Sequence, residues 1–141
     1  MKSFPIKKII ILFLATGALY FSSCKKDDSS PQTSSDDRDK YLGTWTCDET
    51  IQGGPSATYT IVVSKDVTSS TKIKAERFYN LASGAFTFIV VDGNNMTIQS
   101  QQVSGYTLLG SGTFNNSSSM TFNFTSNDGI QVDTVHINAH K

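Results

Sequence analysis

Apolar and polar residues alternate one by one through much of the second half of this chain. The clearest runs are Met-Thr-Phe-Asn-Phe-Thr at 120–125 and Thr-Val-His-Ile-Asn-Ala at 134–139. Because successive side chains of a β-strand point to opposite faces, this alternation predicts strands with one buried face and one face in water. No segment after residue 40 shows a helical period. The pattern therefore restricts this part of the chain to an all-β fold.

Eight strands are predicted, at 41–51, 57–64, 71–81, 85–91, 95–101, 106–114, 120–125 and 134–139. The segment 85–91 is apolar on both faces, and the glycines inside 106–114 indicate a bend or a bulge. Turn sequences such as Asp92-Gly93-Asn94 and Asn127-Asp128-Gly129 connect the strands without room for a crossover. We predict an antiparallel up-and-down meander that removes its exposed edges by closing into a small barrel, with a β-sandwich as the alternative.

The first predicted strand opens with Leu42-Gly43-Thr44-Trp45. This sequence resembles the Gly-x-Trp hallmark of the lipocalins, in which the tryptophan plugs one end of an eight-stranded barrel. The resemblance implies that Gly43 and Trp45 form the plug of a small lipocalin-like barrel. The chain departs from the family in its shorter domain, in lacking the Thr-Asp-Tyr turn motif, and at its end. There His136, His140 and Lys141 stand where an arginine would stack on the tryptophan.

The beginning of the chain has the composition of a secretory signal. Three lysines, at positions 2, 7 and 8, precede an apolar run at 9–21, and the small residues Ser22 and Ser23 follow it. The apolar run is too short to span a bilayer comfortably. Small residues before Cys24 resemble the lipobox of bacterial lipoproteins, which implies a signal peptide at 1–23 and a lipidated Cys24. An ordinary secretory signal with a chance cysteine is the alternative.

The residues after Cys24 suggest where the protein is sent. Lys26, Asp27 and Asp28 resemble the export tag of Bacteroidota surface lipoproteins, which implies an outer-membrane protein, lipid-anchored at the cell surface; a solvated spacer is the alternative. Stable anchoring needs at least two membrane signals, and several acyl chains on Cys24 would supply them. We predict a disordered tether at 24–40, which has no apolar residue to bury, and a barrel domain at 41–141.

Charge and residue content limit the function. The chain has 12 basic and 12 acidic residues, without the basic face that nucleic acid requires. His136 and His140 would lie about 13 Å apart on one strand face, too far to share a metal ion. Cys47 is expected to be a small buried side chain. We predict no catalytic residues, no metal and no cofactor, so the protein is not expected to be an enzyme.

The many aromatic residues of the barrel domain have two interpretations. They would line a cup for a small apolar or amphipathic ligand, with Tyr59, Tyr106 and Phe122 in its wall, or they would simply fill the barrel. Arg77 lies on the inward parity of its strand and would hold a carboxylate head group, unless a bulge near Glu76 turns it out and Phe78 in. The two functions in competition are a ligand-binding lipoprotein and a structural or interaction lipoprotein with a filled barrel.

Overall fold

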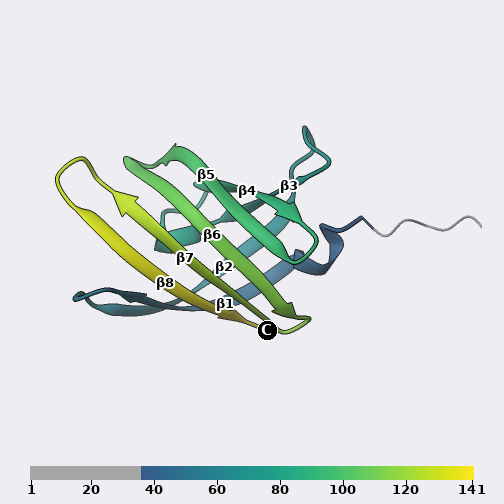
Figure 1. The fold of residues 1–141 in the computed structure, drawn as a ribbon, viewed down its shortest axis with the longest axis horizontal. Helices are drawn as coiled ribbons and strands as arrows, with labels where there is room; N and C mark the ends of the chain where they lie inside the picture. Colours follow the sequence, from purple (N-terminus) through teal and green to yellow (C-terminus); the bar gives the residue numbers. More distant parts are fainter. Residues whose placement is uncertain (1–35) are drawn as a thin grey trace, which may run out of the picture. The chain divides into compact units, whose positions relative to one another are not determined.

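The computed structural model describes residues 36–141, which fold into eight antiparallel strands in a closed barrel (Figure 1). Two short 3₁₀ helices accompany the strands. The elements in order are η1 (Asp39–Tyr41), β1 (Gly43–Ile51), β2 (Ser56–Lys65), β3 (Lys72–Glu76), η2 (Phe78–Asn80), β4 (Phe86–Asp92), β5 (Asn95–Val103), β6 (Tyr106–Asn116), β7 (Ser119–Asn127) and β8 (Val132–His140).

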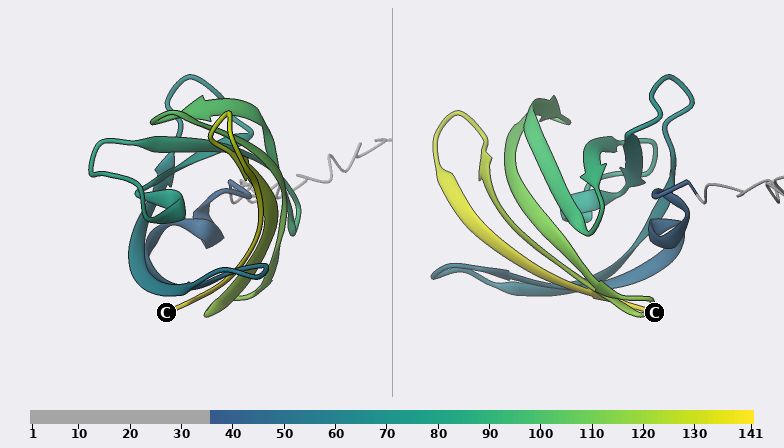
Figure 2. Two further views of the ribbon diagram at one scale, coloured as in Figure 1. Left: turned by 90° about the vertical axis from the view of Figure 1, so that its left-hand side faces the viewer. Right: turned by 45° about the vertical axis from the view of Figure 1, so that its right-hand side comes forward.

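Each strand pairs with the next in sequence, and β8 pairs back onto β1 to close the barrel. Cys47 lies opposite Tyr59 of β2 and opposite Ala139 of β8, so β1 is hydrogen-bonded on both sides. Figure 2 shows the strands curving round into a ring in its left-hand view. The closure confirms the predicted meander and excludes the sandwich.

The connections divide the barrel into two ends. The closed end carries η1 and the connections 66–71, 93–94 and 117–118, and the mouth carries the connections 52–55, 77–85, 104–105 and 128–131. Helix η2 belongs to the mouth.

The interior of the barrel is filled by the inward side chains that the alternation predicts. The largest wholly buried side chains are Trp45, Tyr41, Phe78, Phe122, Ile61, Ile73, Ile89, Met96, Ile98, Leu108, Met120 and Ile137. Each such side chain contributes roughly 1.5–3 kcal/mol through the apolar surface it removes from water. Outward positions of the same strands are mainly threonine, serine and asparagine, so this layer of apolar residues is the principal source of stability.

The glycines of β6 make room for two of these aromatic residues. Gly110 lies opposite Phe124 and Gly112 lies opposite Phe122 on β7. A Cβ atom on Gly112 would stand 2.6 Å from Cδ1 of Phe122, and one on Gly110 would overlap the Phe124 backbone and the Asn123 carbonyl. Glycine is therefore required at both positions for β6 and β7 to pack at this curvature.

The third strand is shorter than predicted. It ends at Glu76 because Arg77 adopts the left-handed conformation, with φ 64°, and turns the chain into η2. The Glu76 carboxylate then accepts hydrogen bonds from Ser83 Oγ at 3.0 Å and from the Gly84 amide at 2.9 Å. These bonds hold the connection 77–85 against the end of β3, so the prediction of a continuous strand to Leu81 was wrong.

The folded domain also begins earlier than the predicted boundary at Tyr41. Arg38 donates hydrogen bonds to the carbonyl groups of Asp66, Ser69 and Lys72, and it forms an ion pair with Asp36 at 2.7 Å. Residues 36–40 are thus part of the barrel and not of a disordered tether. Among the residues described, no helix is long and apolar enough to cross a membrane.

Candidate functional site

The closed end of the barrel is sealed around Trp45. The indole is wholly buried, its Nε1 donates a hydrogen bond of 2.7 Å to the Tyr41 carbonyl, and its ring meets the Phe114 ring edge-on at 6.4 Å. Tyr41 itself is anchored by a hydrogen bond from its hydroxyl to the Gly93 carbonyl. Gly43 has φ 109°, which glycine adopts without strain, and it lies at the start of β1 just before this plug.

Lys141 takes the place in which an arginine was expected. Its Nζ lies 4.2 Å from the centre of the Trp45 ring and donates a hydrogen bond of 2.8 Å to the Leu42 carbonyl. The histidines do not contact the indole: His140 faces Asp48 at 3.6 Å and His136 pairs with Asn123 on the outer surface. The last residue of the chain therefore covers the tryptophan by a cation–π contact.

Three of the four predicted ligand-binding residues are aromatic, and they lie at different depths. Tyr59 and Phe122 are buried and Tyr106 is half-buried near the mouth. Phe122 lies below Phe78 of η2, whose ring centre is 5.1 Å away, so it belongs to the filled part of the lumen. Tyr59 and Tyr106 remain as residues of the mouth.

Arg77 does not face the lumen. Its side chain is exposed, and Phe78, the next residue, is wholly buried instead. The structure shows the alternative stated for this segment, in which the chain turns Arg77 out and Phe78 in. The interpretation of Arg77 as an inward residue that holds a carboxylate was wrong, because the left-handed backbone at Arg77 reverses the parity of the strand. The barrel therefore has no arginine at this position to bind a fatty-acid head group.

The mouth contains an acid that the sequence reasoning missed. Glu49 is 5% exposed, on the inward face of β1 between Cys47 and Ile51, and its Oε2 accepts a hydrogen bond of 2.6 Å from the Tyr59 hydroxyl. Burial raises the pKa of the Glu49 carboxyl, and the bond from Tyr59 offsets this only in part. Glu49 lies on the same face of β1 as Trp45 and Cys47, because alternate residues of a strand share a face. The alternation that predicted those two side chains to be buried therefore also placed Glu49 inside.

Glu49 and Tyr59 act on each other electrostatically. Burial, and then the hydrogen bond to Glu49, raise the pKa of the Tyr59 phenol well above its usual value, so the phenol remains a donor. Burial also raises the pKa of the Cys47 thiol to about 12, which leaves it protonated and unreactive. Cys47 is thus a small buried side chain, and the polar chemistry at this depth is that of Glu49 and Tyr59.

A second polar group lies beside the first at the mouth. The Tyr79 hydroxyl of η2 donates to Asp133 Oδ2 at 3.3 Å, and Ser126, 2% exposed, lies next to it. The Ser126 Oγ lies near the Tyr79 phenol, but it has no partner at hydrogen-bond geometry within residues 36–141. A buried hydroxyl without a partner costs free energy, so this position is unsatisfied as it stands.

Helix η2 closes the mouth over these groups. Phe78 packs against Phe122 and Phe124, each with ring centres 5.1 Å away, and Tyr79 packs edge-on against Tyr106 at 5.4 Å. Arg77, Tyr79 and Asn80 all have positive φ values, which cost non-glycine residues about 1 kcal/mol or more each. The segment that fills the mouth is therefore held there by aromatic packing against its own backbone preference.

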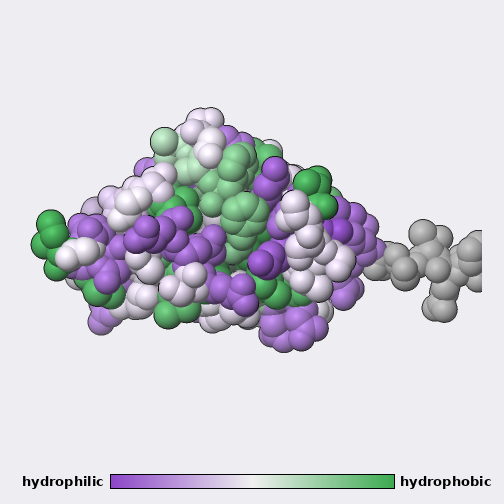
Figure 3. All heavy atoms as spheres, turned by 90° about the horizontal axis from the view of Figure 1, so that it is seen from above, coloured by the Kyte–Doolittle hydropathy of each residue, from purple (hydrophilic) through white to green (hydrophobic). Residues whose placement is uncertain are grey.

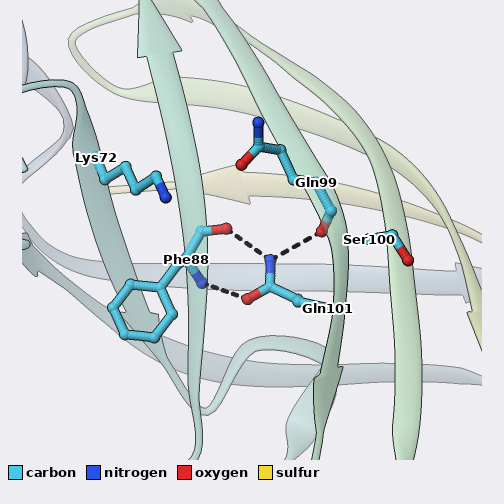
Figure 4. A pocket seen from close by; sticks show the side chains of 5 residues that line it. All are labelled: Lys72, Phe88, Gln99, Ser100 and Gln101. Carbon is cyan, nitrogen blue, oxygen red and sulfur yellow. Dashed lines mark hydrogen bonds between the residues drawn. The ribbon is translucent and has the colours of Figure 1, made fainter.

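A separate hollow of about 250 Å³ opens on the outside of the barrel, where β4 and β5 diverge. The backbone pairing between β4 and β5 covers only Val90–Asp92 of β4. Beyond this segment the Gln101 side chain, and not the β5 backbone, bonds to the β4 backbone (Figure 4). Its amide accepts from the Phe88 N–H at 2.9 Å and donates to the Phe88 carbonyl at 2.7 Å. We call this region the β4–β5 seam; its lining is Lys72, Phe88, Gln99, Ser100 and Gln101.

The outer face at the seam is unusually apolar. Phe86 and Phe88 are 37% and 41% exposed, and Lys74 Nζ lies 4.8 Å above the Phe86 ring. Seen from above, the face that carries β4 and β5 shows a hydrophobic patch among hydrophilic side chains (Figure 3). This accounts for the predicted segment 85–91, whose apolar residues occupy both faces.

The predicted lipidation and export residues, Cys24, Lys26, Asp27 and Asp28, lie outside the described residues.

Comparisons with known proteins support the fold. The chain matches no protein-family model and no curated protein. Among solved structures it is similar to a redesigned β-barrel, b11L5F_LGL, with a TM-score of 0.57, 14% identity, and coverage of 75% of this chain and 95% of that one. It is also similar to EF1p2_mFAP2b, solved bound to DFHBI, with a TM-score of 0.53, 13% identity, and coverage of 76% and 99%. At these identities the likeness concerns the barrel fold.

Proposed function

We propose that this protein is a lipid-anchored, surface-exposed, non-enzymatic lipoprotein of lipocalin-like architecture whose barrel mouth binds a small amphipathic ligand. The observation that carries the binding function is the Glu49–Tyr59 pair, a carboxyl and a phenol joined at 2.6 Å inside an otherwise apolar barrel. A buried acid destabilises a fold unless it is well compensated, and such groups concentrate at functional sites. A barrel of similar fold binds a small molecule, DFHBI, which is compatible with this function.

The ligand enters by displacing the aromatic side chains of η2. Phe78 packs against Phe122 and Phe124, so its removal would open a volume the size of a phenyl ring beside these two residues. The positive φ values of Arg77, Tyr79 and Asn80 lower the free energy needed to move this segment. The closed mouth is thus the ligand-free state of a site that opens on binding.

A neutral probe tests the site without reference to charge. Phe78→Ala should bind phenylpropanol about tenfold more tightly than the native protein in calorimetric titration, because the probe no longer has to displace a ring; tenfold corresponds to about 1.4 kcal/mol. Phe88→Ala, which removes an exposed ring at the seam, is the matched control and should leave the affinity unchanged. Equal affinities of the native protein and Phe78→Ala would place the ligand elsewhere.

The anchor is tested separately. Cys24→Ala should abolish labelling by a fatty-acid analogue and move the protein from the membrane to the soluble fraction. Replacing Lys26, Asp27 and Asp28 with alanine should leave the lipid in place but reduce cleavage by protease added to intact cells. Unchanged labelling of Cys24→Ala would refute the lipoprotein assignment, and unchanged cleavage would refute the export tag.

One observation favours the alternative function, an interaction lipoprotein with a filled barrel. Phe86 and Phe88 form an exposed apolar stripe at the seam, where the edge of β4 that faces β5 pairs with the Gln101 side chain and not with the β5 backbone. Such a stripe suits contact with another protein. If neither the native protein nor Phe78→Ala binds apolar probes, this alternative is the better account of the barrel.

A further inference from the structure

We propose that the mouth selects ligands whose polar head is an organic cation, an amine or ammonium group, over ligands with a neutral or anionic head. This inference rests on the proposed function, because it names the class of ligand for the same site. It follows from three features of the mouth within residues 36–141: acids that accept hydrogen bonds but have no paired cation, aromatic rings, and a buried hydroxyl without a hydrogen-bond partner.

In the described part of the chain, the mouth contains two carboxyl groups without a paired cation. Glu49 is buried on β1, and Asp133 of β8 reaches the Tyr79 hydroxyl at 3.3 Å. Within residues 36–141 neither acid forms an ion pair with a lysine or arginine, and Arg77, at the end of β3, is exposed. Burial, followed by the charges of Asp133 and Glu49, raises the pKa of the Tyr79 phenol. An anionic head would meet repulsion here, whereas a cationic head supplies the missing counter-charge.

Aromatic rings accompany both acids of the mouth. Tyr79 meets Tyr106 at 5.4 Å and Phe124 at 5.7 Å, both edge-on, and Tyr59 holds Glu49 from the neighbouring strand. The faces of such rings attract ammonium groups, most strongly where water is excluded. Rings together with acids form a better environment for an organic cation than either feature alone.

The buried Ser126 hydroxyl provides the independent indication of a ligand. It lies beside Tyr79 on the inward face of β7, 2% exposed, and makes no hydrogen bond within the described barrel. An amine donates hydrogen bonds in several directions, so it can serve the Ser126 oxygen and a carboxylate together. The ligand would thus satisfy a group that the closed mouth leaves unsatisfied.

Three probes with one skeleton test the selection: phenylpropylamine, phenylpropanol and phenylpropanoate. Each is titrated calorimetrically into the purified full chain at about pH 7. The amine should bind at least about tenfold more tightly than the alcohol, a difference of about 1.4 kcal/mol, and the carboxylate should bind most weakly. This ranking needs no variant, so it remains informative even if a substitution at the mouth fails to fold.

Variants assign the preference to the mouth. Glu49→Gln should reduce the ratio of amine to alcohol affinity to near one, and Asp133→Asn should reduce it in part. Asp48→Asn is the matched control, because it removes the same charge from the adjacent outward position and should leave the ratio unchanged. The side-chain amide introduced by Glu49→Gln preserves an acceptor for Tyr59, so the loss would come from the charge.

The outcomes separate the two proposals. Preference for the amine that Glu49→Gln abolishes and Asp48→Asn retains supports the inference. Equal binding of the three probes, or tightest binding of the carboxylate, overturns the inference and leaves the mouth as a ligand site. Absence of binding by all three, in the native protein and in Phe78→Ala, overturns the proposed function and the inference with it.

Discussion

Trp45→Ala is the substitution whose effect on stability follows most directly from the structure. The indole is wholly buried at the closed end, where its ring packs on Phe114 and its Nε1 donates to the Tyr41 carbonyl at 2.7 Å. Removing a large aromatic side chain from a core costs about 3–5 kcal/mol. The Tyr41 carbonyl would also lose its donor, so we expect a loss in the free energy of unfolding near the upper limit, about 5 kcal/mol.

Two further variants resolve this loss into its parts. Trp45→Phe keeps a ring against Phe114 but removes the donor to the Tyr41 carbonyl, and it should cost about 1–3 kcal/mol. Lys141→Met removes the charge that lies 4.2 Å from the indole while keeping the length of the side chain, and it should cost about 0.5–1 kcal/mol, as exposed cation–π contacts do.

The assay is urea unfolding followed by far-ultraviolet circular dichroism, since Trp45→Ala removes the fluorophore. Domains of this kind have about 5–15 kcal/mol of stability in total, so Trp45→Ala should be partly unfolded without denaturant or lie close to that limit. A loss below about 1 kcal/mol would refute the reasoning, because it would mean that the indole is not packed as described.

Three other predictions follow from the barrel. Glu49→Gln should be more stable than the native protein at about pH 7, by about 1 kcal/mol, and equally stable below about pH 4, as measured by unfolding at a series of pH values. Burial raises the pKa of the Glu49 carboxyl above its usual 4.5 in the folded protein. The native protein therefore loses stability as the pH rises from about 4.5 through the folded pKa, because the buried carboxyl then ionises. The opposite pH trend would contradict the burial of Glu49. Gly110→Ala should cost about 1–3 kcal/mol in urea unfolding because its Cβ overlaps the Phe124 backbone, whereas Ser111→Ala on the outer face should be near neutral. Gln101→Ala should speed hydrogen exchange of the Phe88 amide, because the Gln101 side chain accepts a hydrogen bond from it. Gln99→Ala should not, because the Gln99 side chain makes no hydrogen bond within residues 36–141. Equal exchange rates in the two variants would refute the bridging role of Gln101.

The barrel could be predicted because alternation and turn chemistry are local properties that leave few ways to arrange eight strands. Runs such as 120–125 specify which face is buried, and short turns specify antiparallel neighbours. The structure adds that β8 returns to β1, which the need to cover two strand edges had suggested.

Alternation along the sequence no longer predicts which side chains face inward where the backbone leaves the strand conformation. Ile73 and Ala75 are buried as the alternation indicates, but the left-handed residue Arg77 exchanges the faces, so Arg77 is exposed and Phe78 enters the lumen. Nothing in the residues Glu76 to Tyr79 distinguishes a bulge from a continuing strand, because both place one large residue inside. The inward Glu49 was on the predicted parity, yet a carboxyl is normally assigned to the surface, and only its contact with Tyr59 explains how it is accommodated.

In the proposed binding event a ligand enters the mouth and displaces Phe78 to reach the Glu49–Tyr59 pair. The most direct measurement is nuclear magnetic resonance of the isotope-labelled protein saturated with phenylpropylamine, observing intermolecular nuclear Overhauser effects. We expect contacts from the probe to the rings of Tyr59, Tyr106 and Phe124, with large shifts of the Phe78 ring. Contacts confined to Phe86 and Phe88 at the β4–β5 seam, with an unshifted Phe78 ring, would contradict it.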